Sequence, residues 1–395
     1  MTIKTAILHK GKDAPLRRRH PWVFSGAIRR WEGRPQDGEV VEVRSADGEL
    51  LGTGHFQDGS IQVRVFAFEQ VEVNTDFWTA KLNNAFELRR RLGLPQAGHT
   101  DCYRLIHGEG DGLPGLIIDV YGRTAALQCH SIGMHLHRHE LAEALHRTLG
   151  ENLLAVYDKS ADSLPSAYGA AVTPGYLSGH NEPAPVLENG HAFEVDWEGG
   201  QKTGFFLDQR DNRQLLAQYA AGQTVLNAFS YTGGFSVYAL AAGARLVHSV
   251  DISGKAVEAA VRNAALTGVP ADRHEGIVSD VLKYLQTSED GLYDIMVVDP
   301  PAFAKSTEKR HNAIQAYKRL NALAMRKIKP GGLLFTFSCS QVVDRTMFYN
   351  TMVAAAIEAG RAVRVLHHLR QPADHPVSLF HPEGEYLKGL VLEVE

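Results

Sequence analysis

The chain has 395 residues, of which 44% are hydrophobic and 22% charged, ordinary values for a globular protein of two or three domains. Its formal net charge of −4 argues against nucleic-acid binding by bulk charge, so any RNA contact is expected to be local. The three cysteines form no CxxC pair, which argues against a disulfide framework and a structural metal site. There is no apolar run long enough for a membrane span and no signal-peptide pattern, so a cytoplasmic protein is expected.

Short β-rich runs separated by glycine turns fill the first 72 residues. The runs EVVEVRS, DGELLGTGHF and SIQVRVFAF predict a small β-barrel domain over residues 1–72. Basic and aromatic side chains cluster near its start and are the strongest candidates for RNA contact: Arg17, Arg18, Arg19, His20 and Trp22. The alternative for Trp22 is a place in the barrel core.

Residues 73–185 are expected to form a mixed α/β middle domain. The apolar spacing of residues 76–91 predicts a helix, and turn glycines precede a strand in RLIHGEGDGLPGLIIDVYG. Arg89, Arg90 and Arg91 lie at the end of this helix, where they either contact phosphate or meet solvent at the helix terminus. His135 and His139 of HLHRH would share a helical face, but without a further ligand we expect a solvated helix and no metal.

Strands and helices alternate from residue 186 to residue 395. The near-continuous apolar strands TVLNAF, LVHSVD, YDIMVVD and GGLLFTFS, separated by amphipathic helices, predict a parallel sheet covered on both faces. The expected fold is a doubly wound α/β domain. Ligands bind such sheets beyond the carboxyl ends of the strands, so the residues that follow each strand are the first candidates for a site.

Acidic and glycine-rich segments at these strand ends predict a cofactor site. Asp251 ends the second strand, where a carboxylate can accept hydrogen bonds from both hydroxyls of a ribose, and Asp280 follows the third, where it can accept from an adenine amino group. The alternatives are a surface turn at Asp280 and an ordinary tight turn after the first strand. Candidates around the first and fourth strands are Asn227, Phe229, Tyr231, Gly233, Asp299 and Pro300. Four more, just before the first strand, are expected to wall the same site: Lys202, Phe206, Asp208 and Arg210.

A carboxylate and a thiol follow the fourth and fifth strands. Two prolines directly after Asp299 fix the backbone and remove two amide donors, so this carboxylate is held rigidly. Cys339 follows the fifth strand at the same edge, and a thiolate there can add to carbon 6 of a pyrimidine and make carbon 5 nucleophilic. The alternative is that Cys339 is a small buried hydrophobe, as we expect for Cys102 and Cys129.

These segments carry a resemblance to a known family. The whole chain resembles the bacterial ribosomal RNA large-subunit methyltransferase I family, and its C-terminal half resembles class I methyltransferases that use S-adenosylmethionine. The matching segments are RRRHPWVFSGAI, YRLIHGEGDGLPGLIID, KTGFFLDQRDNR, VLNAFSYTGGF, SVDIS, MVVDPPAF, LLFTFSCS, ADHP and PEGEYLKG. The resemblance implies an N-terminal PUA-like RNA-binding domain and S-adenosyl-L-methionine as cofactor.

The same resemblance implies 5-methylation of a cytosine in 23S ribosomal RNA, free or in a large-subunit assembly intermediate. Cys339 would be the nucleophile and Asp299 would hydrogen-bond the base. Related enzymes often carry a second cysteine after the proline loop, which DPPAF lacks, so the group that takes the carbon-5 proton stays open. The segment YDKSADSLPSAYGA resembles a family segment that often carries several basic residues, but its only basic residue here is Lys159. Whether the protein forms a homodimer is not decided by the sequence.

Two other functions are compatible with the sequence. A carboxylate followed by two prolines and the aromatic Phe303 also suits nitrogen methylation of a purine in ribosomal RNA, a reaction that needs no thiol. The other is a non-catalytic RNA-binding ribosome assembly factor with a degenerate cofactor fold, against which the intact acidic series argues.

Overall fold

The computed structural model describes residues 3–304 and 306–395. The chain packs into two compact units. The first consists of Met1–Val186, Val195–Phe205 and Ala373–Gly384, and the second of Leu187–Glu194, Phe206–Pro372 and Glu385–Glu395. The domain ranges 1–72, 73–185 and 186–395 stay predictions. Two segments of the range 186–395, Val195–Phe205 and Ala373–Gly384, pack with the first unit.

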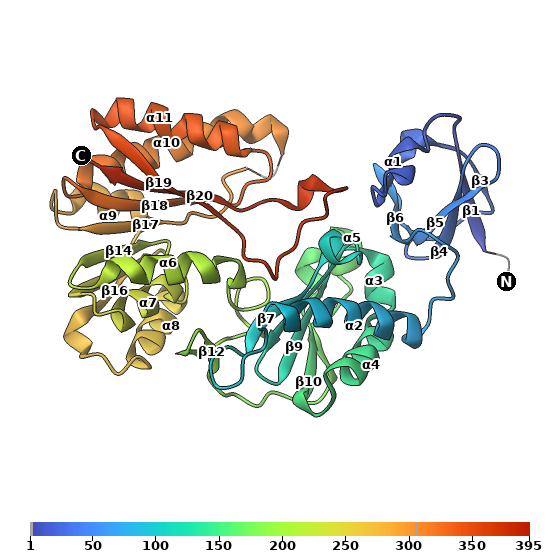
Figure 1. The fold of residues 1–395 in the computed structure, drawn as a ribbon, viewed down its shortest axis with the longest axis horizontal. Helices are drawn as coiled ribbons and strands as arrows, with labels where there is room; N and C mark the ends of the chain where they lie inside the picture. Colours follow the sequence, from blue (N-terminus) through green and yellow to red (C-terminus); the bar gives the residue numbers. More distant parts are fainter. Residues whose placement is uncertain (1–2, 305) are drawn as a thin grey trace. The chain divides into compact units, whose positions relative to one another are not determined.

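A six-stranded sheet forms the N-terminal part of the first unit (Figure 1). Its strands, in the order β2-β6-β5-β4-β1-β3, are β1 (Lys4–Leu8), β2 (Trp22–Phe24), β3 (Ile28–Glu32), β4 (Val40–Arg44), β5 (Leu50–Phe56) and β6 (Ile61–Ala67), and the short helix α1 is Ala14–Arg17. β1 pairs in parallel with β4, and the other neighbours are antiparallel. Val41 and Val43 of β4 and Val63 and Val65 of β6 lie in one core, as period-two alternation predicts.

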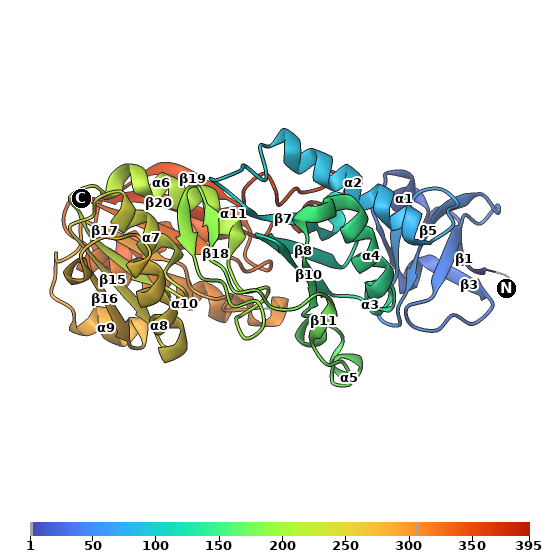
Figure 2. The same cartoon turned by 90° about the horizontal axis from the view of Figure 1, so that it is seen from below.

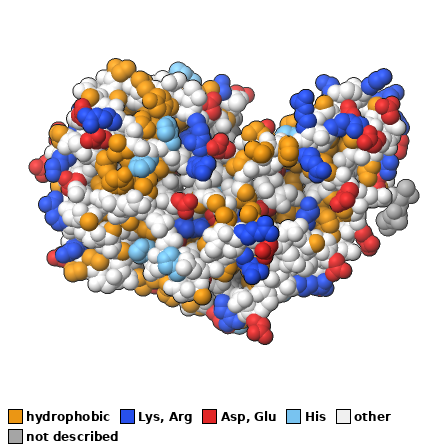
Figure 3. Space-filling model, viewed as in Figure 1, with side chains coloured by type: hydrophobic (Ala, Val, Ile, Leu, Met, Phe, Trp, Pro, Cys, Tyr) orange, Lys and Arg blue, Asp and Glu red, His pale blue; other side chains and the backbone are white. Residues whose placement is uncertain are grey.

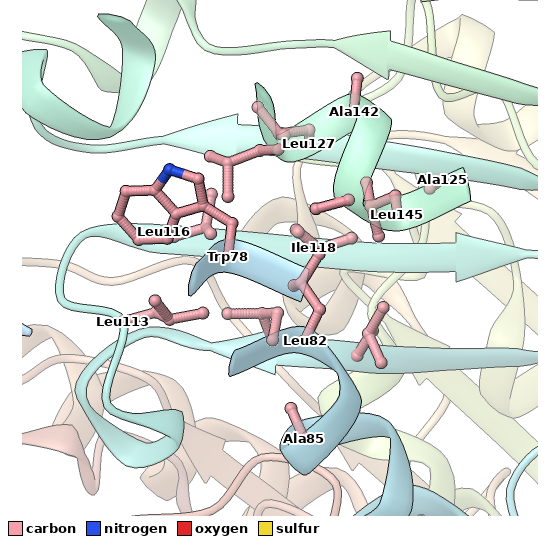
Figure 4. Close-up of a cluster of buried hydrophobic side chains, with 14 of the residues drawn as sticks. Trp78, Leu82, Ala85, Leu113, Leu116, Ile118, Ala125, Leu127, Ala142 and Leu145 are labelled. Carbon is pink, nitrogen blue, oxygen red and sulfur yellow. The ribbon is translucent and has the colours of Figure 1, made fainter. Parts of the chain in front are cut away.

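A five-stranded sheet with helices packed on it follows in the same unit. Its strands, in the order β11-β10-β9-β8-β7, are β7 (Cys102–His107), β8 (Leu116–Tyr121), β9 (Thr124–Cys129), β10 (Ala155–Asp158) and β11 (Gly175–Ser178). The helices are α2 (Thr75–Arg91), α3 (Ile132–Leu136), α4 (Arg138–Leu149) and α5 (Ser166–Gly169). Next in the chain is a two-stranded ladder of β12 (Val186–Glu188) and β13 (His191–Phe193), which belongs, apart from Val186, to the second unit. Figure 4 shows Trp78 and Leu82 of α2 packed with Leu116 and Ile118 of β8. The predicted helix over residues 76–91 is confirmed.

Arg90 and Arg91 are exposed, as the solvent alternative expects, but Arg89 corrects the expectation for the end of this helix. Its side chain is fully buried, and its guanidinium donates to both carboxylate oxygens of Asp111, at 2.5 and 2.8 Å. It also donates to the carbonyl oxygen of Asp374 at 2.7 Å. Arg89 therefore neither contacts phosphate nor meets solvent, because its charge is used to hold the segment Ala373–Gly384 against α2.

The histidines of HLHRH do not share a helix. α3 ends at Leu136 and α4 begins at Arg138, so His135 and His139 lie on different helices. His135 is 3% exposed, and its Nε2 lies 3.2 Å from a carboxylate oxygen of Asp158. The expected solvated helix is wrong here, because the helix break turns His135 into the interior.

The second unit contains a seven-stranded sheet in the order β16-β15-β14-β17-β18-β20-β19 (Figures 1 and 2). The strands are β14 (Thr224–Ala228), β15 (Leu246–Asp251), β16 (His274–Val278), β17 (Ile295–Val298), β18 (Gly332–Ser338), β19 (Val363–Arg370) and β20 (Lys388–Val394). β14 to β18 are parallel, and β20 runs antiparallel between β18 and β19. The order reverses at the neighbouring strands β14 and β17, where open α/β sheets bind ligands.

Helices cover both faces of this sheet. They are α6 (Arg210–Ala220), α7 (Gly234–Ala241), α8 (Gly254–Ala265), α9 (Val281–Thr287), α10 (Arg310–Lys327) and α11 (Arg345–Ala359). Apolar residues of α6, α7 and α8 share one buried cluster with the sheet, and those of α9, α10 and α11 share another. The predicted doubly wound α/β fold is confirmed.

The surface carries charges of both signs. Figure 3 shows Lys and Arg side chains interspersed with Asp and Glu over the face it presents, in line with the small net charge. Among the described residues, none of the helices combines the length and the apolar character that a bilayer crossing requires.

Candidate active site

The turn after β14 holds an unusual backbone conformation. Phe229, Tyr231 and Gly233 have φ values of 60°, 45° and 81°, in the left-handed region that side chains other than glycine rarely adopt. A Cβ atom at Gly233 would lie 2.9 Å from the Cβ atom of Ala260 in α8, so only glycine allows this close approach. Such strain is concentrated at ligand sites, but the packing against α8 explains the glycine by itself.

Asp251 lies beside this turn with its carboxylate already oriented. One oxygen accepts the backbone amide of Tyr231 at 3.0 Å, and the other accepts that of Ser253 at 2.9 Å. A carboxylate has about four acceptor sites, so two remain for hydroxyl groups of a ligand. The remaining acceptor sites of Asp251 and the close approach at Gly233 therefore fit a ribose-containing cofactor, and S-adenosylmethionine, the cofactor predicted from the sequence, would supply an electrophilic methyl group if it were held here.

Asn227 and Asp280 each have a structural role. The amide nitrogen of Asn227, a residue that is 1% exposed, donates to the hydroxyl of Ser236 at 2.9 Å and so joins β14 to α7. Asp280 is the N-cap of α9 and accepts the backbone amide of Lys283 at 2.9 Å. The roles predicted for both residues in cofactor binding stay predictions, and the surface position of Asp280 matches its turn alternative.

The four candidates that precede β14 divide between the two units. Lys202 is an exposed residue of the first unit, whereas the other three belong to the second. The Phe206 ring contacts Tyr231 edge to face, with centroids 5.1 Å apart, beside the β14 turn. A carboxylate oxygen of Asp208 accepts the hydroxyl of Tyr386 at 2.6 Å. Arg210 is 5% exposed, in the interior of the second unit.

Glu188 forms the charged centre of that interior. Its carboxylate accepts two hydrogen bonds from Arg213, both 2.8 Å, and a third from the hydroxyl of Tyr238 at 2.9 Å. The Nε atom of Arg210 lies 3.8 Å from the same carboxylate. Arg213 also donates to the carbonyl oxygen of Phe206 at 3.0 Å. Through Arg213, the Glu188 carboxylate thus stabilises the backbone at Phe206, one of the residues predicted to line the cofactor site.

Asp299 follows β17 and is oriented by a residue that the sequence analysis did not single out. Gln209, which is 3% exposed, donates from Nε2 to Oδ2 of Asp299 at 2.9 Å. Asn212 in turn donates to Oε1 of Gln209 at 2.6 Å, which defines the amide orientation of the glutamine. The only signal in the sequence is the position of Gln209 in KTGFFLDQRDNR, since no local pattern pairs it with Asp299.

Cys339 follows β18, the parallel neighbour of β17, and is partly exposed. The hydroxyl of Ser340 donates to the carbonyl oxygen of Ala304 at 2.8 Å, and this bond ties the thiol loop to the proline loop. Burial raises the pKa of Tyr317 in α10 to about 12, and charges on Cys339 and Asp299 act in the same direction. Both catalytic candidates therefore lie near enough to Tyr317 for their charges to influence its pKa. Cys102 and Cys129 are fully buried in the first unit, as expected.

The predicted RNA-contacting residues lie in the first unit. Arg17 is ion-paired with Asp13 and Glu49, at 2.6 and 2.5 Å, so its charge is partly compensated. Arg18 and Arg19 are exposed, and the Arg19 guanidinium lies 5.4 Å from the centroid of the Phe68 ring. Lys159, the basic residue of the middle segment, donates to the carbonyl oxygens of residues 197, 198 and 200 and has a structural role instead.

Trp22 and His20 contact the segment Ala373–Gly384. The indole of Trp22 donates to Glu109 at 2.9 Å and lies edge to face on His381, with centroids 4.3 Å apart, outside the core of the N-terminal sheet. His20, His381 and Glu383 bring potential metal ligands within 4.8 Å of one another. Nδ1 of His20 accepts the Trp22 amide at 3.2 Å, however, so neutral His20 carries its proton on Nε2, which faces Glu383. This tautomer offers no lone pair there, and we assign no metal to the cluster.

Comparisons with known proteins identify the family of the chain. Residues 104–380 match the model of a family described as S-adenosylmethionine-dependent methyltransferase, and residues 6–68 match a PUA-like domain. Proteins named ribosomal RNA large subunit methyltransferase I are similar over the full length. The one from Erwinia tasmaniensis is 41% identical, covering 100% of both chains, and the one from Aeromonas salmonicida is 42% identical, covering 98% of both.

Solved structures share the fold. A protein from Streptococcus mutans described as a SAM-dependent methyltransferase covers 100% of both chains at 24% identity, with a TM-score of 0.84. A methyltransferase crystallised with SAH gives a TM-score of 0.85 at the same identity and coverage. The chain thus belongs to the S-adenosylmethionine-dependent methyltransferases and, among them, to the ribosomal RNA large subunit methyltransferase I family, with a PUA-like domain at its N-terminal end.

Proposed function

We propose that this enzyme methylates carbon 5 of a cytosine in 23S ribosomal RNA through a transient bond between Cys339 and the base. The observation that carries the proposal is the placement of Cys339 and Asp299 on loops that follow the paired parallel strands β18 and β17. The names of its full-length relatives support large-subunit ribosomal RNA as the substrate.

Each residue then has a definite task. The Cys339 thiolate adds to carbon 6 of the cytosine, and the electron pair displaced from the ring double bond makes carbon 5 nucleophilic. Asp299, oriented by Gln209, holds the base by hydrogen bonding during this addition. After methyl transfer the carbon-5 proton leaves and the bond between sulfur and carbon 6 breaks, which restores the aromatic ring and the free cysteine.

We assign the cofactor to the edge of the sheet at β14 and β15. Asp251 accepts the ribose hydroxyls, while the turn at Gly233 allows the close approach of the backbone. The rest of the predicted set within the second unit would line the same site: Phe206, Asp208, Arg210, Asn227, Phe229, Tyr231, Asp280 and Pro300. RNA contact in the N-terminal domain is assigned to Arg18 and Arg19, with Arg17, His20 and Trp22 beside them.

The reaction is tested by incubating unmodified 23S ribosomal RNA with enzyme and S-adenosylmethionine, followed by mass spectrometry of the nucleosides. We expect 5-methylcytidine with the unaltered chain and with Cys129→Ala, but at least about a thousandfold less with Cys339→Ala, because removal of a nucleophile typically costs this much or more. A methylated purine, or full activity of Cys339→Ala, would contradict the proposal. RNA binding without cofactor binding, measured by calorimetry, would instead indicate an assembly factor.

The covalent step has a separate test. RNA containing 5-fluorocytosine cannot lose a proton from carbon 5, so the adduct with the enzyme should accumulate and migrate as a slow band in a denaturing gel. The band should require S-adenosylmethionine and be absent with Cys339→Ala. A band that persists in this variant would place the nucleophile elsewhere.

A further inference from the structure

Lys388 is a buried lysine beside the loop that carries Cys339. It is the first residue of β20, and its register partner on β18 is Ser338, the residue before the cysteine. The residue is 5% exposed, and its Nζ donates to the carbonyl oxygens of Ser340 and Val343, both at 2.6 Å. Its ammonium group therefore bridges two points of the loop that follows the thiol.

A buried ammonium group lowers the stability of the fold unless other groups interact with its charge. Burial lowers the pKa of Lys388 to about 8, and the charge of Cys339 is the strongest opposing influence. Interaction between two charges is reciprocal, so an ammonium group that is stabilised by a thiolate also stabilises the thiolate. A long apolar side chain would fill the same space without desolvation but would offer neither the hydrogen bonds nor the charge.

Other charged groups act on the same pair. Arg345, near the start of α11, opposes the charge of Lys388, whereas Asp344 and Glu385 favour it. On the side of the thiol, negative charges on Cys339 and on Asp299 each raise the pKa of Tyr317 in α10. Negative charges near a thiol disfavour the thiolate, and a neighbouring cation opposes that effect.

We propose that Lys388 is the positioning residue of Cys339: its ammonium group holds the thiol loop through two carbonyl oxygens and electrostatically stabilises the attacking thiolate. The inference deepens the proposed role of Cys339 and rests on it. Lys388 touches neither the base nor the methyl group in this role, and it acts only through the cysteine.

The test measures the thiol directly, without RNA or cofactor. The full chain and the variants Lys388→Met and Lys388→Arg are alkylated with iodoacetamide from pH 5.5 to 9.5, and the modified Cys339 peptide is quantified by mass spectrometry. A nearby opposite charge shifts a titration by about 1 to 3 pH units, so we expect Lys388→Met to move the midpoint upward by about one unit. Alkylation at pH 7 should then be about tenfold slower, and Lys388→Arg should restore most of the rate.

Controls separate this role from a purely structural one. Lys329→Met removes a lysine of the same unit whose ion pair with Asp294 is at the surface, and it should leave the midpoint unchanged. If Lys388→Met does not fold, Lys388→Gln, which keeps a hydrogen-bond donor without the charge, should show the same upward shift. A lower melting temperature with an unshifted midpoint would overturn the proposal. Because the assay contains no RNA, its failure is distinguishable from failure of cytosine methylation.

Discussion

The hydrogen bond from Gln209 to Asp299 makes a prediction about catalysis. In Gln209→Leu the carboxylate loses a 2.9 Å bond from a buried amide, and Asn212 loses the acceptor it uses at 2.6 Å. Hydrogen bonds to charged groups contribute about 1.5 to 3 kcal/mol. If this bond keeps Asp299 in its working orientation, the same energy is added to the barrier, at about 1.36 kcal/mol for each tenfold change in rate. The expected loss is about 10- to 150-fold in the single-turnover rate.

The assay is transfer of a radiolabelled methyl group to unmodified 23S ribosomal RNA with enzyme in excess. Gln214→Leu is the matched control, since this glutamine is exposed on α6 only a few residues away, and its rate should equal that of the unaltered enzyme. The melting temperature shows whether each variant is folded. A folded Gln209→Leu enzyme with an unchanged rate would refute the view that this bond orients Asp299.

Two further predictions concern stability. Glu188→Gln leaves the charge of Arg213, which is 2% exposed, without its partner, and should lower the free energy of unfolding, measured in urea, by about 3–5 kcal/mol. The control Arg345→Ala, at the exposed pair with Glu385, should lower it by about 0–1 kcal/mol. Equal losses of stability in the two variants would contradict this prediction. His55 is buried with no hydrogen-bond partner for its ring nitrogens among the described residues, and burial holds its pKa well below 6.5. The unfolded chain therefore takes up the proton first as the pH falls through 6.5, so stability declines below that pH. His55→Leu should have a higher melting temperature than the unaltered chain at pH 5, and its melting temperature should depend less on pH. If the melting temperatures of both proteins fall equally between pH 7 and pH 5, the decline has another origin.

Local patterns predicted the strands and helices of the C-terminal half and the edge of the sheet at which we propose the site. Apolar strands such as Thr224–Ala228 and Ile295–Val298 are buried on both faces, so their composition alone marks them as inner strands of a parallel sheet. Parallel strands present their carboxyl ends at one edge, and this topology is why the sequence predicts that Asp299 and Cys339 lie on neighbouring loops.

Tertiary structure decided which side chains support these two groups. Gln209 and Asp299 are 90 residues apart in the chain, Lys388 and Ser340 are 48 apart, and Arg89 reaches Asp374 across 285 residues. No periodicity encodes such pairs, because they depend on how loops and helices pack after the elements have formed. The same packing gave Arg89 and Lys159 structural partners in place of RNA. The sequence thus predicts the catalytic candidates at the strand ends, whereas the side chains that contact their loops were identified only in the folded chain.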